Sequence, residues 1–577
     1  MQYLSTQVIT PGFKQEYIGE VLARLHHRIS PNHFTPMSDV HPGPVPHSEA
    51  QVPPTLEEKK KAIVDDTPSL PRDIDDSLVL PTNDLLPPDA TPPTSRTEIW
   101  SYYAYYIGAN GLSLFNFGPT AFQNLLSQAA PQDTGLLPFA GRERDVNSIV
   151  LLANGISFAC QAVLFLCIGA YADFGTGRRW VLVFWSVVAF AVGFAWLGVH
   201  DPSRWKAGAA LYVLGLVAYQ LTLTYWTAAF PALARGLPAM REARARVAEG
   251  GMTGREFARL DERERSRLAN VAFYVQSVGE VVILAVIVGI MFALHVNDGT
   301  EQNNWGLSVL VAFATACWVA LSLPWFVLEK TRPGLKVPAG MNLVSVGFWQ
   351  LYEAMTKIWH LKQSLVYLVG YFLLGDSLNT TVTVIGTLQN QVVSYDTLTL
   401  TYLLIVGIVA QAVGIGLFWL LQKRFDLSAK TMFNAVMVGI LLLDGWGMVG
   451  NWTDKFGFHN VWEIWLYQAF YGLFVCPWYS YSQILISSVT PPGHEFLFFS
   501  LFSIIGKTSS FIGPLVSSAI IDATPDQSGN SAPFYFLFAL SFVSAAFIWF
   551  FLDLEKSAVE QQQFLEQEKA RILGVNE

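Results

Sequence analysis

The sequence predicts an all-α integral membrane protein with twelve transmembrane helices in two six-helix halves. Of the 577 residues, 52% are apolar and only 14% are charged, whereas a typical soluble domain carries about 25% charged residues. From Trp100 onward, long apolar runs alternate with short polar loops. Lys and Arg gather in every second loop, as expected of helices that cross a membrane back and forth.

Twelve of the apolar runs are long enough to span a bilayer. At a rise of 1.5 Å per residue, about 20 residues cross a hydrocarbon core of ~30 Å. Backbone groups in lipid must be hydrogen-bonded within the segment, so each run is expected to be a helix. The expected spans are residues 99–126, 147–170, 180–199, 207–233, 270–294, 305–327, 364–387, 397–421, 431–450, 461–489, 497–521 and 533–552.

The loops predict the orientation. Those after spans 2, 4, 6, 8 and 10 carry 19 Lys and Arg residues, whereas the loops on the other side carry five. Basic loops remain in the cytosol, so both termini are expected there. The sequon that begins at Asn451 falls on the non-cytosolic side, in agreement with this topology.

The chain divides into five segments by composition. Residues 1–96 hold 15 of the 30 prolines and five of the ten histidines, and such a segment is expected to be mostly disordered. No apolar signal-peptide region follows Met1. Between the two sets of six spans, apolar residues recur at helical spacing and predict a helix on the membrane surface. The expected segments are a cytosolic tail (1–96), an N-terminal half (97–327), a cytosolic linker with the interfacial helix (328–363), a C-terminal half (364–555) and a cytosolic C-terminal tail (556–577).

Several classes of function are disfavoured. The formal charge of −9 argues against a nucleic-acid partner. All four cysteines fall in apolar stretches and are interpreted as small core residues. We find no nucleophile–base pair, metal-ligand spacing or phosphate-binding loop, so we expect no enzyme activity, no cofactor and no metal.

A short motif follows span 2. Asp173 is followed by two glycines and then by Arg178 and Arg179. This pattern, like the two six-span halves, resembles the major facilitator superfamily, in which the motif gates the cytosolic side. The loop here is one residue longer than the usual spacing. Alternatively, the two arginines are only positive-inside anchors.

Three ionisable residues lie deep in spans that start on the cytosolic side: Glu280 in span 5, Asp376 in span 7 and Lys507 in span 11. An ionised group at the centre of a helix costs about 3 kcal/mol or more, so such residues are functional candidates. All three sit near one depth, close to the midplane where transporters of this layout bind substrate. We assign coupling to Glu280, as proton carrier, and to Lys507. Asp376 and Lys507 are expected to form an ion pair; alternatively Lys507 reaches Asp173 or a lipid headgroup.

Polar faces on spans 1, 4, 7 and 10 predict a central cavity. On span 7, Asp376, Asn379 and Thr380 fall at i, i+3 and i+4, on one helix face. The alternative is that such residues hydrogen-bond between helices without touching substrate. The expected substrate-binding residues are Asn110, Gln220, Tyr225, Asp376, Asn379, Thr380, Gln468 and Tyr471.

Residues 472–514 carry a more specific resemblance. The stretches PPGHE at 491–495 and GKTSSFIGP at 506–514 resemble the autophagy-related protein 22 family, fungal vacuolar amino-acid effluxers of the major facilitator superfamily. The similarity covers about residues 97–555. One departure is Gln483, where the family often has arginine.

The resemblance implies a vacuolar membrane transporter that exports neutral amino acids of the leucine, isoleucine and tyrosine type, linked to autophagy. Its partners would be amino acids, the lipid bilayer and protons. From the residues alone, a proton-coupled sugar, peptide or drug carrier remains open. So does a non-transporting receptor or scaffold that works through the tail.

Overall fold

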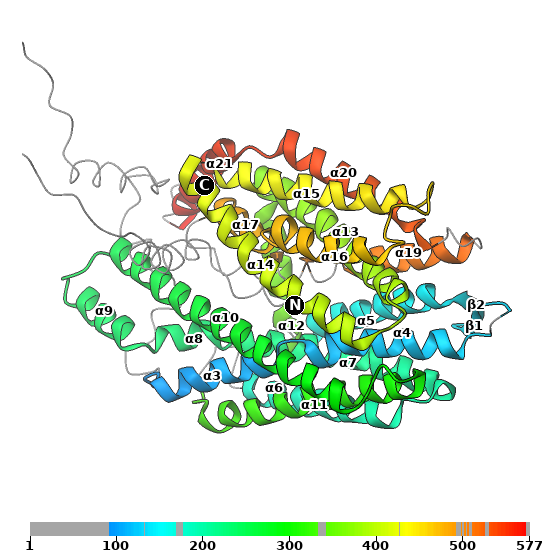
Figure 1. Cartoon of the computed structure of the whole chain (residues 1–577). Helices are drawn as coiled ribbons and strands as arrows, with labels where there is room; N and C mark the ends of the chain where they lie inside the picture. The colour runs from blue at the N-terminus through cyan, green and yellow to red at the C-terminus, as the bar shows by residue number, and fades with distance from the viewer. Residues whose placement is uncertain are drawn as a thin grey trace, which may run out of the picture.

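The computed structural model describes residues 92–131, 133–168, 177–332, 342–425, 427–491, 498, 501–502, 505–506, 510–524 and 530–572. In these ranges the protein is almost entirely helical, and its only sheet is a two-stranded hairpin. The elements from α3 to α11 form one bundle and those from α13 to α20 form a second, which lie one above the other in Figure 1. The prediction of an all-α membrane fold is confirmed at this level. The predicted tail up to residue 91 lies outside the described residues.

The described part of the first bundle is built from nine α-helices that follow the expected N-terminal spans and their loops. Its hairpin joins α4 to α5, and the strands pair antiparallel with Leu136 opposite Asp145. The elements are α3 (Arg96–Gly108), η4 (Leu112–Phe117), α4 (Gly118–Ala129), β1 (Leu136–Phe139), β2 (Arg142–Asp145), α5 (Val146–Ile168), α6 (Arg178–Ala195), η6 (Trp196–Gly198), η7 (Pro202–Arg204), α7 (Trp205–Thr227), α8 (Phe230–Arg235), α9 (Pro238–Ala248), α10 (Gly254–Ala293) and α11 (Thr300–Leu328).

The second bundle follows a helix in the linker, α12, at the place where the sequence predicts one. Whether α12 lies on a membrane surface stays a prediction. A last helix, α21, covers the expected C-terminal tail and packs against α13 and α17. The elements are α12 (Leu343–Ile358), α13 (Lys362–Val392), α14 (Thr397–Phe425), α15 (Ala429–Val449), α16 (Val461–Phe470), η8 (Tyr471–Val475), α17 (Trp478–Ser488), α19 (Ile512–Ala523), α20 (Pro533–Phe551) and α21 (Leu554–Ile572).

Local sequence explains where several helices start. At the start of α10 the Thr253 hydroxyl accepts a hydrogen bond from the Glu256 amide, and the Glu256 carboxylate accepts one from the Thr253 amide, which forms a capping box. At the start of α16 the Glu463 carboxylate accepts a hydrogen bond from the Asn460 amide at 3.0 Å. Helix α10 is 40 residues long, longer than a bilayer needs, because its arginine-rich first turns continue the apolar segment.

Nine helical segments in the described ranges are long and apolar enough to cross a membrane. The twelve-span count is not confirmed, because two of the expected spans are divided into shorter helices and a third is described only in part. Expected span 1 is divided into α3, η4 and α4, and expected span 10 into α16, η8 and α17. Of expected span 11, the longest described piece is α19.

The break in expected span 1 has an identifiable cause. Gly111 adopts φ +92°, in the left-handed region that L side chains avoid. The side chain of Asn110 accepts a hydrogen bond from the Leu112 amide at 2.9 Å, which replaces a helical bond. A Cβ at Gly111 would lie 3.0 Å from the Tyr219 hydroxyl. Span 10 breaks before α17 because Pro477 has no N–H to donate.

The bundles meet along α5 with α19 and along α10 with α14. Near the start of α5, Arg144 forms an ion pair with Asp522 of the second bundle. One helical turn further along, the Ser148 and Ser518 hydroxyls lie 2.9 Å apart. These helix ends adjoin the loops that carry few basic residues, and we call this end of the molecule the closed side.

Amide side chains extend the contact across the closed side. Gln123 of α4 donates to the Thr387 carbonyl at 2.9 Å and accepts from the Asn390 amide at 2.8 Å. On the other flank, the Thr397 hydroxyl donates to Asn303 at 2.6 Å. The described hydrogen bonds between the bundles therefore gather at the closed side. We call the opposite end, where the arginine-rich loops lie, the basic side.

Candidate functional site

On α13, the predicted polar face contacts α19 and the residues just before it. Asp376 is buried, and one of its carboxylate oxygens accepts a hydrogen bond from the Gly513 amide at 3.1 Å. The Thr380 hydroxyl donates back to the Asp376 carbonyl at 2.8 Å. The Asn379 amide donates to the Ser510 hydroxyl at 2.9 Å. The three predicted residues thus lie together against the stretch that carries the GKTSSFIGP motif.

Gly513 allows this contact. A Cβ at that position would lie 2.0 Å from the Thr380 hydroxyl and 3.1 Å from the Asp376 carboxylate, which is too close for any side chain. The backbone N–H can therefore approach the carboxylate directly. Because Lys507 lies outside the described residues, the ion pair between Asp376 and Lys507 stays a prediction.

The predicted residues of expected span 10 contact other helices of the second bundle. The Gln468 amide donates to Gln389 of α13 at 2.7 Å. The Tyr471 hydroxyl lies 3.2 Å from the Tyr479 hydroxyl, across the π-helical segment η8. Such segments are frequent at functional sites, but these two contacts are also those of a helix interface. Their role in substrate binding stays a prediction.

In the first bundle, the predicted substrate-binding residues are all buried. Asn110 stabilises the break in expected span 1, and Gln220 of α7 is buried with no hydrogen-bond partner for its side-chain nitrogen among the described residues. Tyr225 lies nearer the basic side, where its hydroxyl donates to the Ile168 carbonyl. None of the described hydrogen bonds joins these three side chains, and their role in substrate binding stays a prediction.

Glu280 is fully buried in α10. One carboxylate oxygen accepts from the Gln276 amide at 2.7 Å, and the other has no hydrogen-bond partner in the described part of the chain. A buried carboxylate with no cation beside it among the described residues is costly unless it binds a proton or a cationic ligand. The predicted coupling role is compatible with this environment.

The basic side holds the two arginines predicted to act in gating. Arg178 forms an ion pair with Glu329 after α11 and donates to the Tyr225 carbonyl at 3.0 Å. Arg179 donates to the carbonyls of Phe326 and Glu329. The arginines therefore bind elements of their own bundle here. Asp173 lies outside the described residues, so its gating role stays a prediction.

Sequence inspection missed two further groups of charged residues. Glu98 of α3 accepts two hydrogen bonds from Arg332, at 2.6 and 2.9 Å, and both side chains are buried. Asp444 of α15 is fully buried, with its carboxylate bonded to the hydroxyls of Thr381 and Ser541. Asp444 was detectable, because it is an ionisable residue inside an apolar run.

The electrostatics of the closed side involve Asp145, at the end of β2. Burial raises the pKa of this carboxyl above its usual range, partly offset by hydrogen bonds from backbone amides such as that of Asn147. In the turn between α13 and α14, burial raises the pKa of Tyr395 to about 12. Among the described residues, no cluster of three or more His, Cys, Asp and Glu could hold a metal.

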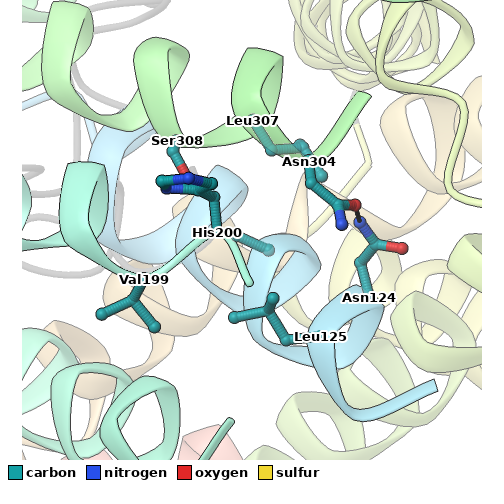
Figure 2. A pocket seen from close by; sticks show the side chains of 8 residues that line it. Asn124, Leu125, Val199, His200, Asn304, Leu307 and Ser308 are labelled. Carbon is teal, nitrogen blue, oxygen red and sulfur yellow. Dashed lines mark hydrogen bonds between the residues drawn. The ribbon is translucent and has the colours of Figure 1, made fainter. Parts of the chain in front are cut away.

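A small pocket opens in the first bundle near the closed side (Figure 2). It is lined by Asn124 and Asn304, which are hydrogen-bonded at 2.7 Å, and by His200 and apolar side chains. Its volume of about 10 Å³ suffices for about one water molecule. This pocket is too small for an amino acid.

Comparison with solved structures identifies the fold. The match to a crystallised D-xylose-proton symporter covers 80% of this chain and 98% of that one, with 10% sequence identity and a TM-score of 0.50. Another similar chain is a proton:xylose symporter of the major facilitator superfamily, with 12% identity, a TM-score of 0.46 and coverage of 79% of this chain and 96% of that one. The likeness to the first of these structures shows that this chain shares its fold.

Sequence comparison defines the family. A family model described as vacuole effluxer Atg22 like matches residues 94–562, so the chain belongs to this family. It is 22% identical over 557 residues to autophagy-related protein 22 of Neurospora crassa, covering 83% of this chain and 74% of that protein. It is 24% identical over 474 residues to autophagy-related protein 22 of Pichia angusta, and this match covers 77% of this chain and 82% of that protein.

Proposed function

We propose that the protein exports neutral amino acids from the vacuole lumen to the cytosol by alternating access, as part of the recycling that follows autophagy. The basic side faces the cytosol and the closed side faces the lumen. The family description, the autophagy-related relatives and the transporter fold support this proposal.

The observation that carries the transport mechanism is the difference between the two ends of the bundle pair. Hydrogen bonds and one ion pair join the bundles at the closed side, so the conformation is sealed toward the lumen. A carrier in this state releases its substrate toward the cytosol. Breaking these contacts, and forming others at the basic side, would return the substrate site to the lumen.

The substrate class rests on the chemistry of a zwitterion. An amino acid needs an anionic partner for its ammonium group, a cationic or amide partner for its carboxylate and an apolar pocket. Asp376 supplies the first, Lys507 and the amides of Asn379 and Gln468 supply the second, and the tyrosines of η8 and α17 line the third. Glu280, which is enclosed and has no cation beside it in the described part of the chain, serves as the proton carrier.

The test is a solute screen with purified protein in proteoliposomes and with isolated vacuoles. Labelled leucine, isoleucine and tyrosine should leave vacuoles that hold the protein and should remain in vacuoles that lack it. Labelled xylose is the matched control for a sugar carrier, and its preferential flux would overturn the amino-acid assignment. A protein that moves no solute, and whose cellular effect disappears when residues 1–90 are deleted, would be a scaffold instead.

The Asp376→Asn variant addresses the site itself. Asparagine retains the oxygen that accepts from the Gly513 amide but removes the negative charge. We expect the apparent affinity for leucine to fall at least about tenfold, which corresponds to about 1.4 kcal/mol, at unchanged abundance. Wild-type affinity in this variant would remove Asp376 from the ammonium site.

A further inference from the structure

A second buried carboxyl group lies behind the face of α13 that carries Asp376. Asp444 of α15 is fully buried, and its hydrogen-bond partners among the described residues are uncharged. The Thr381 hydroxyl donates to one carboxylate oxygen at 2.5 Å, and the Ser541 hydroxyl of α20 donates to the other at 2.6 Å. No charged side chain of the described residues acts on it. A permanent charge without a counterion is unfavourable at such a site.

The hydroxyl groups form a chain that continues beyond Asp444. The Ser541 oxygen lies 2.7 Å from the Ser377 hydroxyl, which in turn can donate to the Leu537 carbonyl at 3.0 Å. All of these side chains are fully buried. The chain therefore runs from a carboxyl group, through two rotatable hydroxyls, to a carbonyl that only accepts.

Such a chain satisfies the carboxyl group in both of its protonation states. When Asp444 is ionised, Thr381 and Ser541 both donate to it. When a proton adds to the oxygen that faces Ser541, the new O–H donates to Ser541. The Ser541 hydroxyl then rotates to donate to Ser377, and Ser377 donates to Leu537. No hydrogen-bonding group is left without a partner, because the hydrogen bond between Ser541 and Asp444 reverses its direction when the proton is taken up.

Glu280 and Asp376 lack this arrangement. Glu280 has one oxygen with no described partner, and Asp376 accepts from a backbone amide whose hydrogen cannot be turned away. Of these three carboxyl groups, Asp444 is the one whose two oxygens both accept from hydroxyls that can rotate.

The location of Asp444 connects it to both the closed side and the candidate substrate site. It lies five residues before the end of α15 at Val449, or ~7.5 Å along the helix from the closed side. On α13, Ser377 and Thr381 of the hydroxyl network each follow directly after Asp376 and Thr380 of the candidate site. The same turns of α13 therefore contact both Asp444 and the candidate substrate site.

We propose that Asp444 is a proton-binding site loaded from the closed side, and that its charge sets how tightly α13 is held against α15 and α20. The ionised form draws hydroxyls of α13 and α20 onto one carboxylate, whereas the neutral form binds them less strongly, because hydrogen bonds to charged groups are the stronger ones. Only the transport arm of the test rests on the function proposed above.

Infrared difference spectroscopy on the full-length protein in lipid vesicles tests the proton site without any transported solute. Lowering the pH should produce the carbonyl band of a protonated carboxylic acid that Asp444→Asn lacks. Ser541→Ala should keep this band and shift its pH midpoint, whereas Glu280→Gln and Asp376→Asn should leave it unchanged. Asparagine fits the network, because its oxygen accepts from Thr381 and its nitrogen donates to Ser541.

An unchanged band in Asp444→Asn overturns the proposal. So does a band that shifts with sodium concentration at fixed pH, because the site would then bind a metal cation. The second arm measures labelled leucine efflux against lumenal pH, and Asp444→Asn should flatten this dependence. Efflux from the variant with the wild-type pH profile also overturns the proposal. If the wild-type protein moves no leucine but the band behaves as expected, the proposed substrate fails and the proton site stands.

Discussion

The closed side and the basic side are stabilised in different ways. At the closed side, short polar contacts such as Ser148 with Ser518 and Gln123 with Asn390 join one bundle to the other. At the basic side, the described ion pairs of Glu98 with Arg332 and of Arg178 with Glu329 tie together elements at the end of the first bundle. Neutral contacts between bundles are easily exchanged, whereas buried charge pairs are not. We therefore expect the two halves to move as rigid bodies and to separate at the closed side, where we call the contacts of Arg144, Ser148 and Gln123 with the second bundle the seam.

The largest expected effect comes from making the seam permanent. In a variant without the four native cysteines, Ser148→Cys combined with Ser518→Cys places two thiols where the hydroxyls lie 2.9 Å apart. Oxidation should form a disulfide across the bundles and reduce flux at least about tenfold, because the closed side can no longer open. Reductant should restore transport, and each single-cysteine variant serves as a control. Normal flux after complete cross-linking would show that the seam need not open.

Removing one partner of a buried charge pair should lower stability next most strongly. Glu98→Gln leaves the Arg332 guanidinium buried beside a neutral amide, and breaking such a pair costs about 3–5 kcal/mol. Thermal unfolding in detergent measures this loss. Adding Arg332→Met should recover much of it. The exposed pair of Glu242 and Arg246 is the matched control, since Glu242→Gln should change stability by no more than about 0.5 kcal/mol. Equal effects at both pairs would contradict the comparison.

A smaller effect is expected from the ion pair across the seam. Arg144 and Asp522 retain side-chain exposures of 14% and 21%, so their pair should contribute up to about 1 kcal/mol. Arg144→Ala should therefore increase the population open to the lumen by up to about fivefold. Labelling of a cysteine introduced at Ser518 by an impermeant reagent measures the opening. A labelling rate lower than that of the parent protein, which retains Arg144, would show that this ion pair does not hold the closed side shut.

The smallest expected effect is the pH dependence of the seam. Burial raises the pKa of Asp145 in the closed conformation, so this conformation binds the proton more readily than an open one in which the carboxyl meets water. Acid therefore stabilises the seam, and this contribution is lost as the pH rises through the raised pKa. Cysteine labelling at Ser518 should slow as the lumen is acidified. Asp145→Asn should weaken this dependence, whereas Asp133→Asn in the neighbouring loop should not.

The sequence alone was sufficient for the class of fold, because apolar length and the distribution of basic loops follow directly from the properties of a bilayer. It also placed Asp376, Asn379 and Thr380 on one face of a helix, since that depends only on helical periodicity. The resemblance at residues 506–514 identified the family that the sequence comparison shows.

Partners of buried polar groups were decided only by the tertiary structure. Ser148 and Ser518 are 370 residues apart in the chain, and nothing in either local sequence indicates that they meet. The position of Tyr225 in span 4 predicts a cavity residue. The packing of α7 instead brings its hydroxyl to the end of α5, where it donates to the Ile168 carbonyl. Asp444 acquires its hydroxyl partners from α13 and α20. Helical periodicity fixes the face on which a side chain lies, whereas the atoms opposite that face depend on how distant helices pack.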